Sequence, residues 1–499
     1  MNVLLASSEL FPYSKTGGLA DMVAALGKAL AIDGHRVRIV TPLYRGIREK
    51  HPAITRLDST ITVQLDGRIV SSHLWSAEPA PNLQILFIDH PEYYDRASIY
   101  GENSRDYPDN AARFIFFSKA VAYLARTLPD PPEVVHAHDW QVGLVPLLIQ
   151  HDALITGWHT APATVLTIHN LAYQGVFPYH DYQLTNLPNE YFHADGLEFY
   201  GKMNCLKAGI VYADIITTVS PRYAREITTE QFGCGLDGVL RSRHDRLVGI
   251  LNGVDYGEWK TEGNKFLTHS YNSGNFDGKA VLKAELQAEV KLPVLPHVPL
   301  FGTITRLAEQ KGIDILISAL EEMLPSNMQF ILLGSGDPGY ERGFRALAER
   351  FPEKVSVQFG YNHGLSHRIE AGLDFFLMPS RFEPCGLNQM YSLRYGTIPI
   401  VRVTGGLDDS VTDVSEDPEI ADGIKFAEYS SRALVKAIRK ALVLYEDKPL
   451  LAHFRRNAMS VDFSWEHCTH EYEAAFERAI ELRRAAHTRT GVAPIDTSP

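Results

Sequence analysis

Residues 2–34, NVLLASSELFPYSKTGGLADMVAALGKALAIDG, contain the pattern that decides the fold. The apolar run NVLLAS predicts a buried strand, and the segment that starts at LADM repeats apolar residues at the spacing of one helical face. These residues are Leu19, Val23, Leu26 and Leu30. Gly34 follows as the expected C-terminal cap. The turn TGGLAD (16–21) lies between the two, so two glycines stand where a strand leads into a helix.

The same alternation of strand and helix continues along the chain. Further strands are predicted in RVRIVTP, LQILFID, EVVHAHD, ATVLTIHN and DIITTVS, and a second series begins with LVGILNG, LFGTIT, MQFILLG, VSVQFG, DFFLMPS and TIPIVRV. Alternating strands and helices indicate parallel sheets with right-handed crossovers. Two series predict an α/β protein with two doubly wound domains. The predicted segments are residues 1–246, residues 247–463, a helix over 464–485 and a flexible tail over 486–499.

The composition of the chain indicates which partners and which cellular compartment to expect. The chain has 499 residues, 45% of them hydrophobic, with a net charge of −12. An acidic chain is a poor match for nucleic acid or an anionic membrane, so neither is an expected partner. The four cysteines are scattered without a CxxC pair, which favours a reducing compartment. The first residues lack a basic segment, and no apolar run reaches the ~18 residues of a membrane span, so a cytoplasmic enzyme is expected.

The turn at 16–21 has the chemistry of a phosphate site, and TGGLDD (404–409) repeats it in the second half. Glycines leave backbone N–H groups accessible, and a helix N-terminus carries partial positive charge. Lys15 adds a full charge beside the first turn. The sequence has no G-x-x-x-x-G-K-[ST], which excludes a Walker-type NTPase. Chance resemblance between two glycine-containing turns is the alternative.

The segment GSGDPG (334–339) matches the dinucleotide fingerprint. A dehydrogenase also needs an acidic residue at the end of the next strand, about 20 residues further on. Gly360 and Tyr361 occupy that place. The pattern therefore predicts a tight turn rather than a nicotinamide site.

Histidines mark two strand ends in the first half. His136 and His138, in HAHD, point to the same side of a predicted strand, and His169 ends another. A metal site is one interpretation, but no third ligand has the usual spacing. The alternative is that Asp139, His169 and Asn170 hydrogen-bond a polyhydroxylated ligand at the carboxyl edge of the sheet, where open α/β sheets bind ligands.

Charged residues follow two strands of the second half. Arg306 and Lys311, in TRLAEQKG, are either solvated surface cations or a clamp for a pyrophosphate. Glu383 lies in SRFEPCGLNQMYSLRYG (380–396) just before a predicted helix. Its carboxylate either complements the helix dipole or binds sugar hydroxyls and a developing oxocarbenium ion. Cys385 is expected to be a small packed residue, since no partner base is evident.

Taken together, these stretches resemble one enzyme family. The sequence is similar to bacterial glycogen synthases and plant starch synthases, which use ADP-glucose. The matching stretches are SSELFPYSKTGGLADM, VVHAHDWQVGL, TIHNLAYQG, LKAGIVYAD, TTVSPRYAREI, LNGVD, TRLAEQKG, PSRFEPCGLNQMY and TGGLDDSV, and the resemblance extends to about residue 480. It implies the GT-B fold, in which two Rossmann-like domains face each other across a cleft and the last helix crosses back to the first domain.

The resemblance also implies an activity and its residues. The expected reaction transfers glucose from ADP-glucose to the non-reducing end of an α-1,4-glucan with retained configuration, and it needs no cofactor and no metal. The implied catalytic residues are Glu383, Arg306, Lys311, His169 and Asp139. The implied donor-binding residues are Lys15, Gly18, Asn252, Tyr361, Cys385, Gly386, Leu387, Thr404, Gly405 and Gly406, with Leu407 completing the second glycine turn.

Single roles follow from the matched motifs. Arg306 and Lys311 resemble the pair that stabilises the departing ADP, and Glu383 aligns with the carboxylate of the family's E-P-C-G motif. His169 resembles the histidine beside the glucose ring, which Asp139 and Asn252 help to hold. Tyr361 is the candidate for packing on the adenine.

The chain departs from the family pattern at two positions. Asn388 stands where threonine or isoleucine is common, and Asp408 stands where alanine or valine is frequent. Both flank the matched motifs and leave the charged residues in place. They concern the fine donor preference rather than the reaction class.

Three other functions remain open at this stage. The first is a GT-B enzyme that uses UDP-glucose or another acceptor. The second is a non-catalytic glucan-binding protein. The third is a glucan phosphorylase, which shares the fold and would need a lysine-bound pyridoxal phosphate. No second carboxylate is evident near Glu383 in the sequence, which favours departure and attack on the same face of the sugar over a covalent intermediate.

Overall fold

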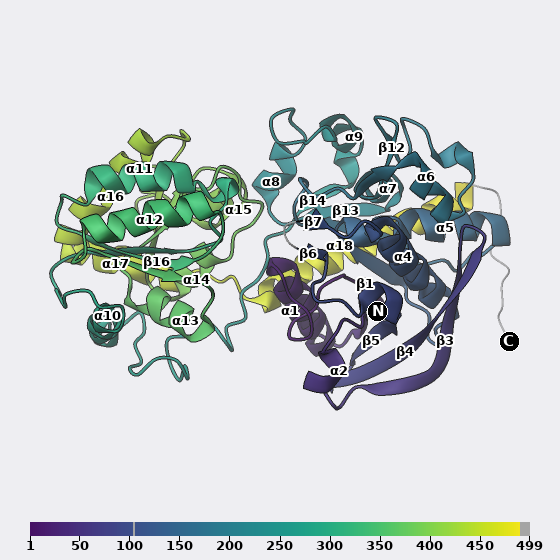
Figure 1. The fold of residues 1–499 in the computed structure, drawn as a ribbon, viewed down its shortest axis with the longest axis horizontal. Coiled ribbons are helices and arrows are strands. Elements are labelled where there is room, and N and C mark those ends of the chain that lie inside the picture. Colours follow the sequence, from purple (N-terminus) through teal and green to yellow (C-terminus); the bar gives the residue numbers. More distant parts are fainter. Residues whose placement is uncertain (103–104, 490–499) are drawn as a thin grey trace. The chain divides into compact units, whose positions relative to one another are not determined.

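The computed structural model describes residues 1–102 and 105–489 and divides the chain into two compact units (Figure 1). Unit 1 contains Met1–Val219, Ala224–Gly253 and the segment that begins at Trp465. Unit 2 contains Ser220–Tyr223 and Val254–Ser464. Of the predicted tail, residues 490–499 lie outside the described part of the chain.

The second unit begins later than the predicted boundary at 246/247. Strand β14 (Leu247–Gly249) pairs in parallel with β13 (Ile215–Thr218), so LVG is the last strand of the first sheet and not the first strand of the second. A three-residue apolar strand satisfies the pattern of either sheet, and only its pairing partner decides between them. The predicted final helix is α18 (Trp465–Arg489), which is part of unit 1, as the crossing-back helix of the resemblance implies.

A nine-stranded sheet forms the centre of unit 1, in the order β14-β13-β9-β8-β1-β2-β5-β4-β3. Its remaining strands are β1 (Asn2–Ala6), β2 (Arg36–Pro42), β3 (Thr55–Leu65), β4 (Arg68–Ala80), β5 (Leu83–Asp89), β8 (Val134–His138) and β9 (Ala163–Ile168). Strands from β14 to β5 pair in parallel, whereas β4 pairs antiparallel with both β5 and β3. The carboxyl ends of β1, β8 and β9 therefore meet at one edge.

Helices surround this sheet, and short strands in the connecting loops form two small additional sheets. The helices are α1 (Gly18–Ile32), α2 (Ile47–Lys50), α3 (Pro91–Tyr94), α4 (Asn110–Thr127), α5 (Val145–Thr156), α6 (Tyr179–Tyr182), α7 (Cys205–Tyr212), α8 (Pro221–Glu226) and α9 (Asp237–Ser242). The short strands are β6 (Gly101–Glu102), β7 (Arg105–Asp106), β10 (Val176–Pro178), β11 (Glu198–Phe199) and β12 (Lys202–Asn204). Helix α1 confirms the helix predicted after the first glycine turn, and Gly34 has the positive φ of the expected cap (90°).

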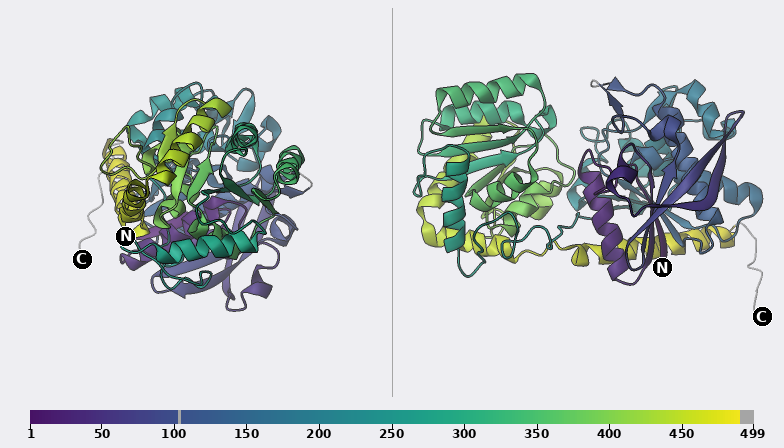
Figure 2. Two further views of the ribbon diagram at one scale, coloured as in Figure 1. Left: turned by 90° about the vertical axis from the view of Figure 1, so that its left-hand side faces the viewer. Right: turned by 60° about the horizontal axis from the view of Figure 1, so that its bottom comes forward.

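Helix α18 packs against strands β8, β9 and β13 and beside α1 (Figure 2). Its residues Tyr472, Phe476 and Ala479 are completely buried. The Phe476 ring lies 5.3 Å from the ring of His136. The last helix therefore contributes to the core of unit 1, which its sequence pattern alone does not show.

Unit 2 has a six-stranded, entirely parallel sheet in the order β17-β16-β15-β18-β19-β20. Its strands are β15 (Leu300–Ile304), β16 (Gln329–Gly334), β17 (Val355–Phe359), β18 (Phe375–Met378), β19 (Ile398–Arg402) and β20 (Ile424–Phe426). Its helices are α10 (Asp277–Glu289), α11 (Ile313–Met323), α12 (Pro338–Arg350), α13 (His363–Gly372), α14 (Asn388–Arg394), α15 (Gly405–Ser410), α16 (Ser431–Glu446) and α17 (Lys448–Ser460).

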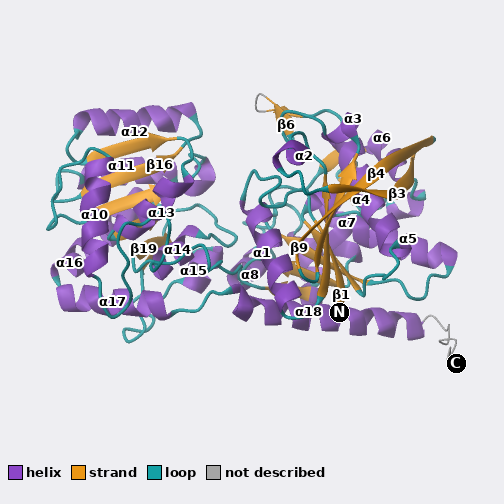
Figure 3. Ribbon diagram, turned by 90° about the horizontal axis from the view of Figure 1, so that it is seen from below, coloured by secondary structure: helices purple, strands orange, loops and turns teal. Residues whose placement is uncertain are grey.

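Helices cover both faces of this sheet, as in a doubly wound fold. Helices α11, α12 and α16 lie on one side, and α10 and α13 lie on the other (Figures 1 and 3). The main core cluster of the unit joins α11, α12, α16 and α17 to the sheet, and a smaller cluster includes residues of α10 and α13. In the described part of the chain, no helix combines the length and the apolar character needed to cross a membrane.

Candidate functional site

The first glycine turn of unit 1 already holds a carboxylate. Glu9 accepts hydrogen bonds from the backbone N–H groups of Thr16 (2.5 Å) and Gly17 (3.2 Å). The hydroxyls of Thr16 (2.6 Å) and Tyr100 (2.7 Å) donate to the same carboxylate. The turn therefore has the anion-binding chemistry that its sequence predicts, but a side chain of the same unit uses two of its amides. Gly18 begins α1 directly after them.

Lys15 lies beside this turn and is also partnered. Its Nζ is 2.7 Å from a carboxylate oxygen of Asp21, in the first turn of α1, and both side chains are about a third exposed (38% and 33%). An exposed pair of this kind contributes little to stability. Nζ is also 2.8 Å from the other Asp21 oxygen, so the ammonium group keeps at least one further donor and can bind an anion without first losing Asp21.

The ends of strands β8 and β9 bring together the polar residues predicted there. Asp139 follows β8, and its Oδ1 accepts the backbone N–H of His169 (2.8 Å), which follows β9. His138 Nδ1 is 3.1 Å from His169 Nε2. Burial lowers the pKa of His169 to about 3, so its imidazole is neutral at pH 7. A neutral ring that keeps one N–H can donate to a sugar hydroxyl.

Asp139 is held in an unusual state. Its backbone, with a φ of 62° and a ψ of −174°, lies in a region that is essentially restricted to glycine, so the surrounding structure holds Asp139 in a strained conformation. Burial raises its pKa to about 7, against the opposing effect of hydrogen bonds from the backbones of His169 and Asn170. The negative charge of Glu9 adds to this rise in the pKa.

Asn252 lies in the loop after β14, also within unit 1. The side chain is buried (6% exposed), and its Oδ1 has no hydrogen-bond partner within the described structure. A buried carbonyl without a donor is costly unless a ligand or water supplies one. This fits the predicted contact with a sugar hydroxyl.

Glu383 of unit 2 lies in the loop between β18 and α14 and is buried (5% exposed). Its Oε2 accepts a hydrogen bond from Lys311 Nζ at 2.6 Å and from Ser380 Oγ at 2.9 Å. The two residues that the sequence places 72 positions apart thus form an ion pair. Lys311 ends a short turn, and Gly312 after it (φ 70°) lets that turn approach the backbone of Pro379, where a Cβ would lie 2.0 Å from the carbonyl oxygen.

The second glycine turn supports this loop directly. Gly406 N–H points to the carbonyl oxygens of Glu383 and Pro384, both at 3.1 Å. A Cβ on Gly405 would lie 1.9 Å from the Glu383 oxygen, and one on Gly406 would lie 2.2 Å from the Cys385 oxygen. Thr404, Gly405, Gly406 and Leu407 are all buried. The Gly406 amide thus binds the E-P-C-G loop in this structure, where the sequence predicted contact with a phosphate.

Other predicted residues of unit 2 have different degrees of exposure. Arg306 is exposed at the end of β15, and Tyr361 is exposed (73%) just before α13. Cys385 is buried, as expected of a packed residue. Gly386 has a φ of 72°, which a residue with a Cβ would adopt only with strain, and Leu387 caps α14.

The two departures from the family pattern have clear contacts. Asn388 donates from Nδ2 to the carbonyl oxygen of Ile304 (2.6 Å), which ties the start of α14 to the end of β15. Asp408 accepts from Lys425 Nζ (3.0 Å). Both interactions are internal to unit 2 and are structural.

Sequence reasoning missed Glu9 and Ser380, although both lie in stretches that it quoted. Glu9 is six residues before Lys15, and Ser380 is three residues before Glu383. A carboxylate close in sequence to a glycine turn could have predicted the role of Glu9, because the backbone N–H groups of such a turn need an acceptor when no ligand is present. The position of Ser380 gave no such signal.

Comparison with known families supports the assignment of both units. Residues 2–242 match the family described as the starch synthase catalytic domain, and residues 290–461 match the glycosyl transferases group 1 family. A glycogen synthase from Myxococcus xanthus is 47% identical over 489 residues, covering 96% of this chain and 100% of that protein. One from Koribacter versatilis is 44% identical over 488 residues, covering 97% and 99%.

Solved structures of related enzymes support the same assignment of family and fold. The catalytic domain of starch synthase IV from Arabidopsis thaliana, bound to ADP and acarbose, superposes with a TM-score of 0.87 at 33% identity and covers 96% of this chain and 99% of that one. A sucrose-phosphate synthase from Thermosynechococcus elongatus, at 18% identity and a TM-score of 0.60, shares the fold. The chain belongs to the family of bacterial glycogen synthases and plant starch synthases and is a glycosyltransferase with the GT-B fold.

Proposed function

We propose that this chain transfers glucose from ADP-glucose to the non-reducing end of an α-1,4-glucan such as glycogen, with retention of configuration and without a metal or other cofactor in the chemical step. The relatives that support this are named as glycogen synthases, and the starch synthase structure carries ADP and acarbose. The scattered cysteines support a cytoplasmic location.

The buried Lys311–Glu383 pair is the observation that carries the proposal. The Glu383 carboxylate is 5% exposed, and its buried position is compensated by a lysine 2.6 Å away and by the Ser380 hydroxyl, which donates to the same oxygen. Arg306 precedes Lys311 by five residues, and its side chain is exposed at the end of β15. The fold positions the Lys311–Glu383 pair before any ligand binds, which is the condition for electrostatic stabilisation of a transition state.

The chemical step then needs few protein groups. The bond from the glucose C1 to the diphosphate oxygen breaks, and the acceptor 4-hydroxyl oxygen attacks C1 on the same face. The acceptor proton passes to the departing diphosphate. Lys311 and Arg306 neutralise the charge on that leaving group, and Glu383 stabilises positive charge on the sugar. In unit 1, His169 and the unpartnered Asn252 Oδ1 are the groups proposed to hold the glucose hydroxyls.

The test is transfer of radiolabelled glucose to glycogen by the full-length chain, with ADP-glucose and UDP-glucose compared at equal concentrations. Faster labelling from ADP-glucose supports the proposal. Preference for UDP-glucose would replace the donor assignment, and no labelling from either donor would contradict the activity. Assay of the same preparation for phosphorolysis, together with its absorbance in the pyridoxal Schiff-base band, distinguishes a phosphorylase.

The proposal about metal is tested in the same assay with EDTA. Unchanged labelling is expected, because lysine and arginine supply the positive charge that Mg²⁺ supplies in other nucleotide-dependent enzymes. Loss of labelling on chelation, with recovery when Mg²⁺ is restored, would contradict a metal-independent step.

A further inference from the structure

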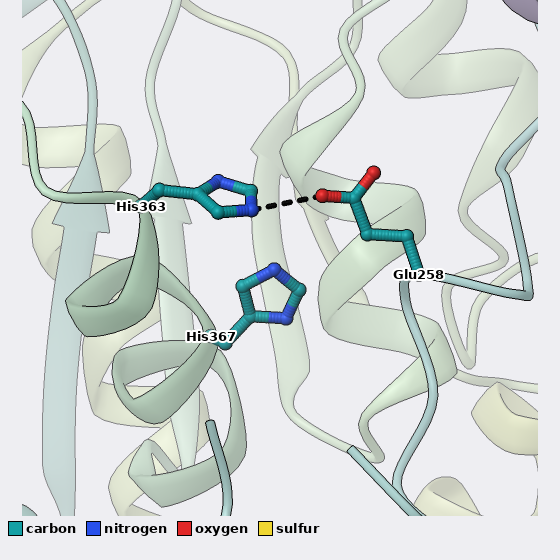
Figure 4. A group of neighbouring side chains, drawn as sticks. All are labelled: Glu258, His363 and His367. Atoms are coloured by element: carbon teal, nitrogen blue, oxygen red, sulfur yellow. Dashed lines mark ion pairs between the residues drawn. The ribbon is translucent and has the colours of Figure 1, made fainter. Parts of the chain in front are cut away.

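A cluster of three potential metal ligands lies within unit 2, outside the residues proposed for glucose transfer. It consists of Glu258, His363 and His367, and one ligand atom from each lies within 4.8 Å of the others. His363 and His367 are four residues apart on α13, so they share one face of the helix. Glu258 approaches from the segment before α10, and its Oε1 is 2.8 Å from His363 Nε2 (Figure 4).

His367 provides the observation that points to a ligand. The residue is completely buried, and its Nε2 has no hydrogen-bond partner in the described structure. Its other ring nitrogen, Nδ1, lies 2.9 Å from the hydroxyl of Tyr395. One nitrogen of this ring points toward the His363–Glu258 pair (Figure 4). A buried nitrogen without a partner costs free energy that a bound ion would recover.

The surroundings hold the ring of His367 in this direction. Trp259, next to Glu258 in the chain, stacks on the imidazole with centroids 4.1 Å apart and planes inclined by 14°. Trp259 also stacks on Tyr391, with ring centroids 3.7 Å apart. The hydroxyl of Tyr395 and the side-chain amide of Asn264, whose Nδ2 is 3.3 Å away, hold Nδ1 and so fix the orientation of the imidazole, which leaves Nε2 as the ring nitrogen without a partner in the described structure.

We propose that Glu258, His363 and His367 bind a divalent transition-metal ion of the zinc class, with water or another ligand in the remaining position. Two imidazoles and one carboxylate form a ligand set that Zn²⁺ uses, whereas Mg²⁺ and Ca²⁺ prefer oxygen ligands alone. The three ligand atoms lie up to 4.8 Å apart, and around a tetrahedral Zn²⁺ such atoms stand about 3.3 Å apart, so the longest separation has to shorten by as much as about 1.5 Å. Glu258 and His363 in turn have to separate by roughly half an ångström. Both are partly exposed (38% and 39%), which permits this movement and provides a path for the ion.

The site is adjacent in sequence to the residue expected against the adenine. Tyr361 places its hydroxyl 3.1 Å from His363 Nδ1, the ring nitrogen that does not face Glu258. An ion on His363 Nε2 would therefore fix a ring that is hydrogen-bonded to Tyr361. Binding of the ion does not depend on the proposed glucosyl transfer, and any effect on nucleotide binding rests on that proposal.

The experiment is calorimetric titration of the full-length, metal-stripped and untagged chain with ZnCl₂ in a non-chelating buffer at neutral pH. One ion per chain is expected. His363→Ala and Glu258→Gln should each weaken binding by about tenfold or more, because each removes one of three ligands. His269→Ala is the matched control, since His269 is an exposed histidine of the same unit that lies 3.6 Å from Glu285, and it should leave the titration unchanged.

Titration with Co²⁺ gives a second readout through the intense visible absorption of tetrahedral cobalt, which should appear at one equivalent and be lost in His363→Ala. Absence of saturable Zn²⁺ binding at about 100 µM would overturn the proposal, since a built site should bind in the micromolar range or tighter. Binding that is equally strong in His363→Ala and Glu258→Gln would also overturn it. Donor and glucan are absent from both titrations, so failure of this site and failure of glucosyl transfer are separate results.

Discussion

The two glycine turns, TGGLAD at 16–21 and TGGLDD at 404–409, have nearly the same sequence and different physical environments. Each turn donates to a glutamate, but the first donates to the side chain of Glu9 and the second to the backbone carbonyl of Glu383. A Cβ on Gly17 would meet nothing within 4 Å, whereas one on Gly405 would overlap the Glu383 oxygen at 1.9 Å. We therefore expect the first turn to exchange its carboxylate for another anion, and the second turn to act as a fixed support for the Glu383 loop.

The buried carboxylates of the two units, Asp139 in unit 1 and Glu383 in unit 2, also differ in their environments. Glu383 has a lysine partner at 2.6 Å. Asp139 has only backbone donors and a neutral histidine beside it, and burial raises its pKa to about 7. The unit 2 carboxylate therefore has a full positive charge as its partner, whereas burial dominates the environment of the unit 1 carboxylate.

Glu383→Gln should produce the largest effect. Because the support from Gly406 uses the backbone of residue 383, the substitution removes charge without removing the turn. We expect kcat to fall by about 10³-fold, in the range for loss of one preorganised electrostatic group. The measurement is glucose transfer at saturating donor, with the thermal midpoint as a check of folding. A variant that retains activity within a fewfold would show that Glu383 is not part of the chemistry.

Gly405→Ala should destabilise unit 2 strongly, and Gly17→Ala should destabilise unit 1 only slightly. Gly405 has a φ of 45° in addition to its contact with the Glu383 oxygen, so we expect a loss of about 3 kcal/mol in stability. Gly17 has an extended φ of −151°, and alanine there should cost about 0.5 kcal/mol as a poorer helix cap. Urea denaturation of both variants measures the difference. Equal destabilisation would remove the distinction between the two turns.

The sequence predicts the parts of this picture that depend on chain-local patterns. Apolar periodicity and glycine turns indicate two parallel α/β units, and strand ends bring Asp139 next to His169 because parallel strands end at a common edge. Pairing across the chain is not encoded in local patterns. Nothing local shows that Leu247–Gly249 joins the first sheet, that Gly406 donates to the backbone of Glu383, or that Glu258 meets His363.

Asp139→Asn tests whether the unit 1 carboxylate is held at an energetic cost. With a pKa of about 4 unfolded and about 7 folded, the folded chain holds one more proton between these values, so its stability falls as pH rises through that window. Asparagine cannot lose that proton and still accepts from the His169 N–H. From pH 5 to pH 8 we expect the variant to gain about 2–3 kcal/mol relative to the unsubstituted chain in urea denaturation. Parallel pH profiles would show that Asp139 is ionised at little cost.

Glu9→Gln should give the smallest effect and tests the exchangeable turn. An amide has one acceptor oxygen in place of two, so one or more of the donors from Thr16, Gly17 and Tyr100 loses its partner. We expect a loss of about 1 kcal/mol in the stability of unit 1, measured by urea denaturation. Asp21→Asn is the control, because it removes only the exposed pair with Lys15 and should cost less than about 0.5 kcal/mol.

A ligand should cancel the effect of Glu9→Gln if the turn exchanges its acceptor. ADP supplies phosphate oxygens that can replace the missing carboxylate oxygen at the Thr16 and Gly17 amides. The stability difference between Glu9→Gln and the unsubstituted chain should therefore shrink at saturating ADP, whereas the difference for Gly405→Ala should persist, because its clash is with backbone that ADP does not replace. If ADP leaves both differences unchanged, the first turn is as fixed as the second, and its glycines are structural.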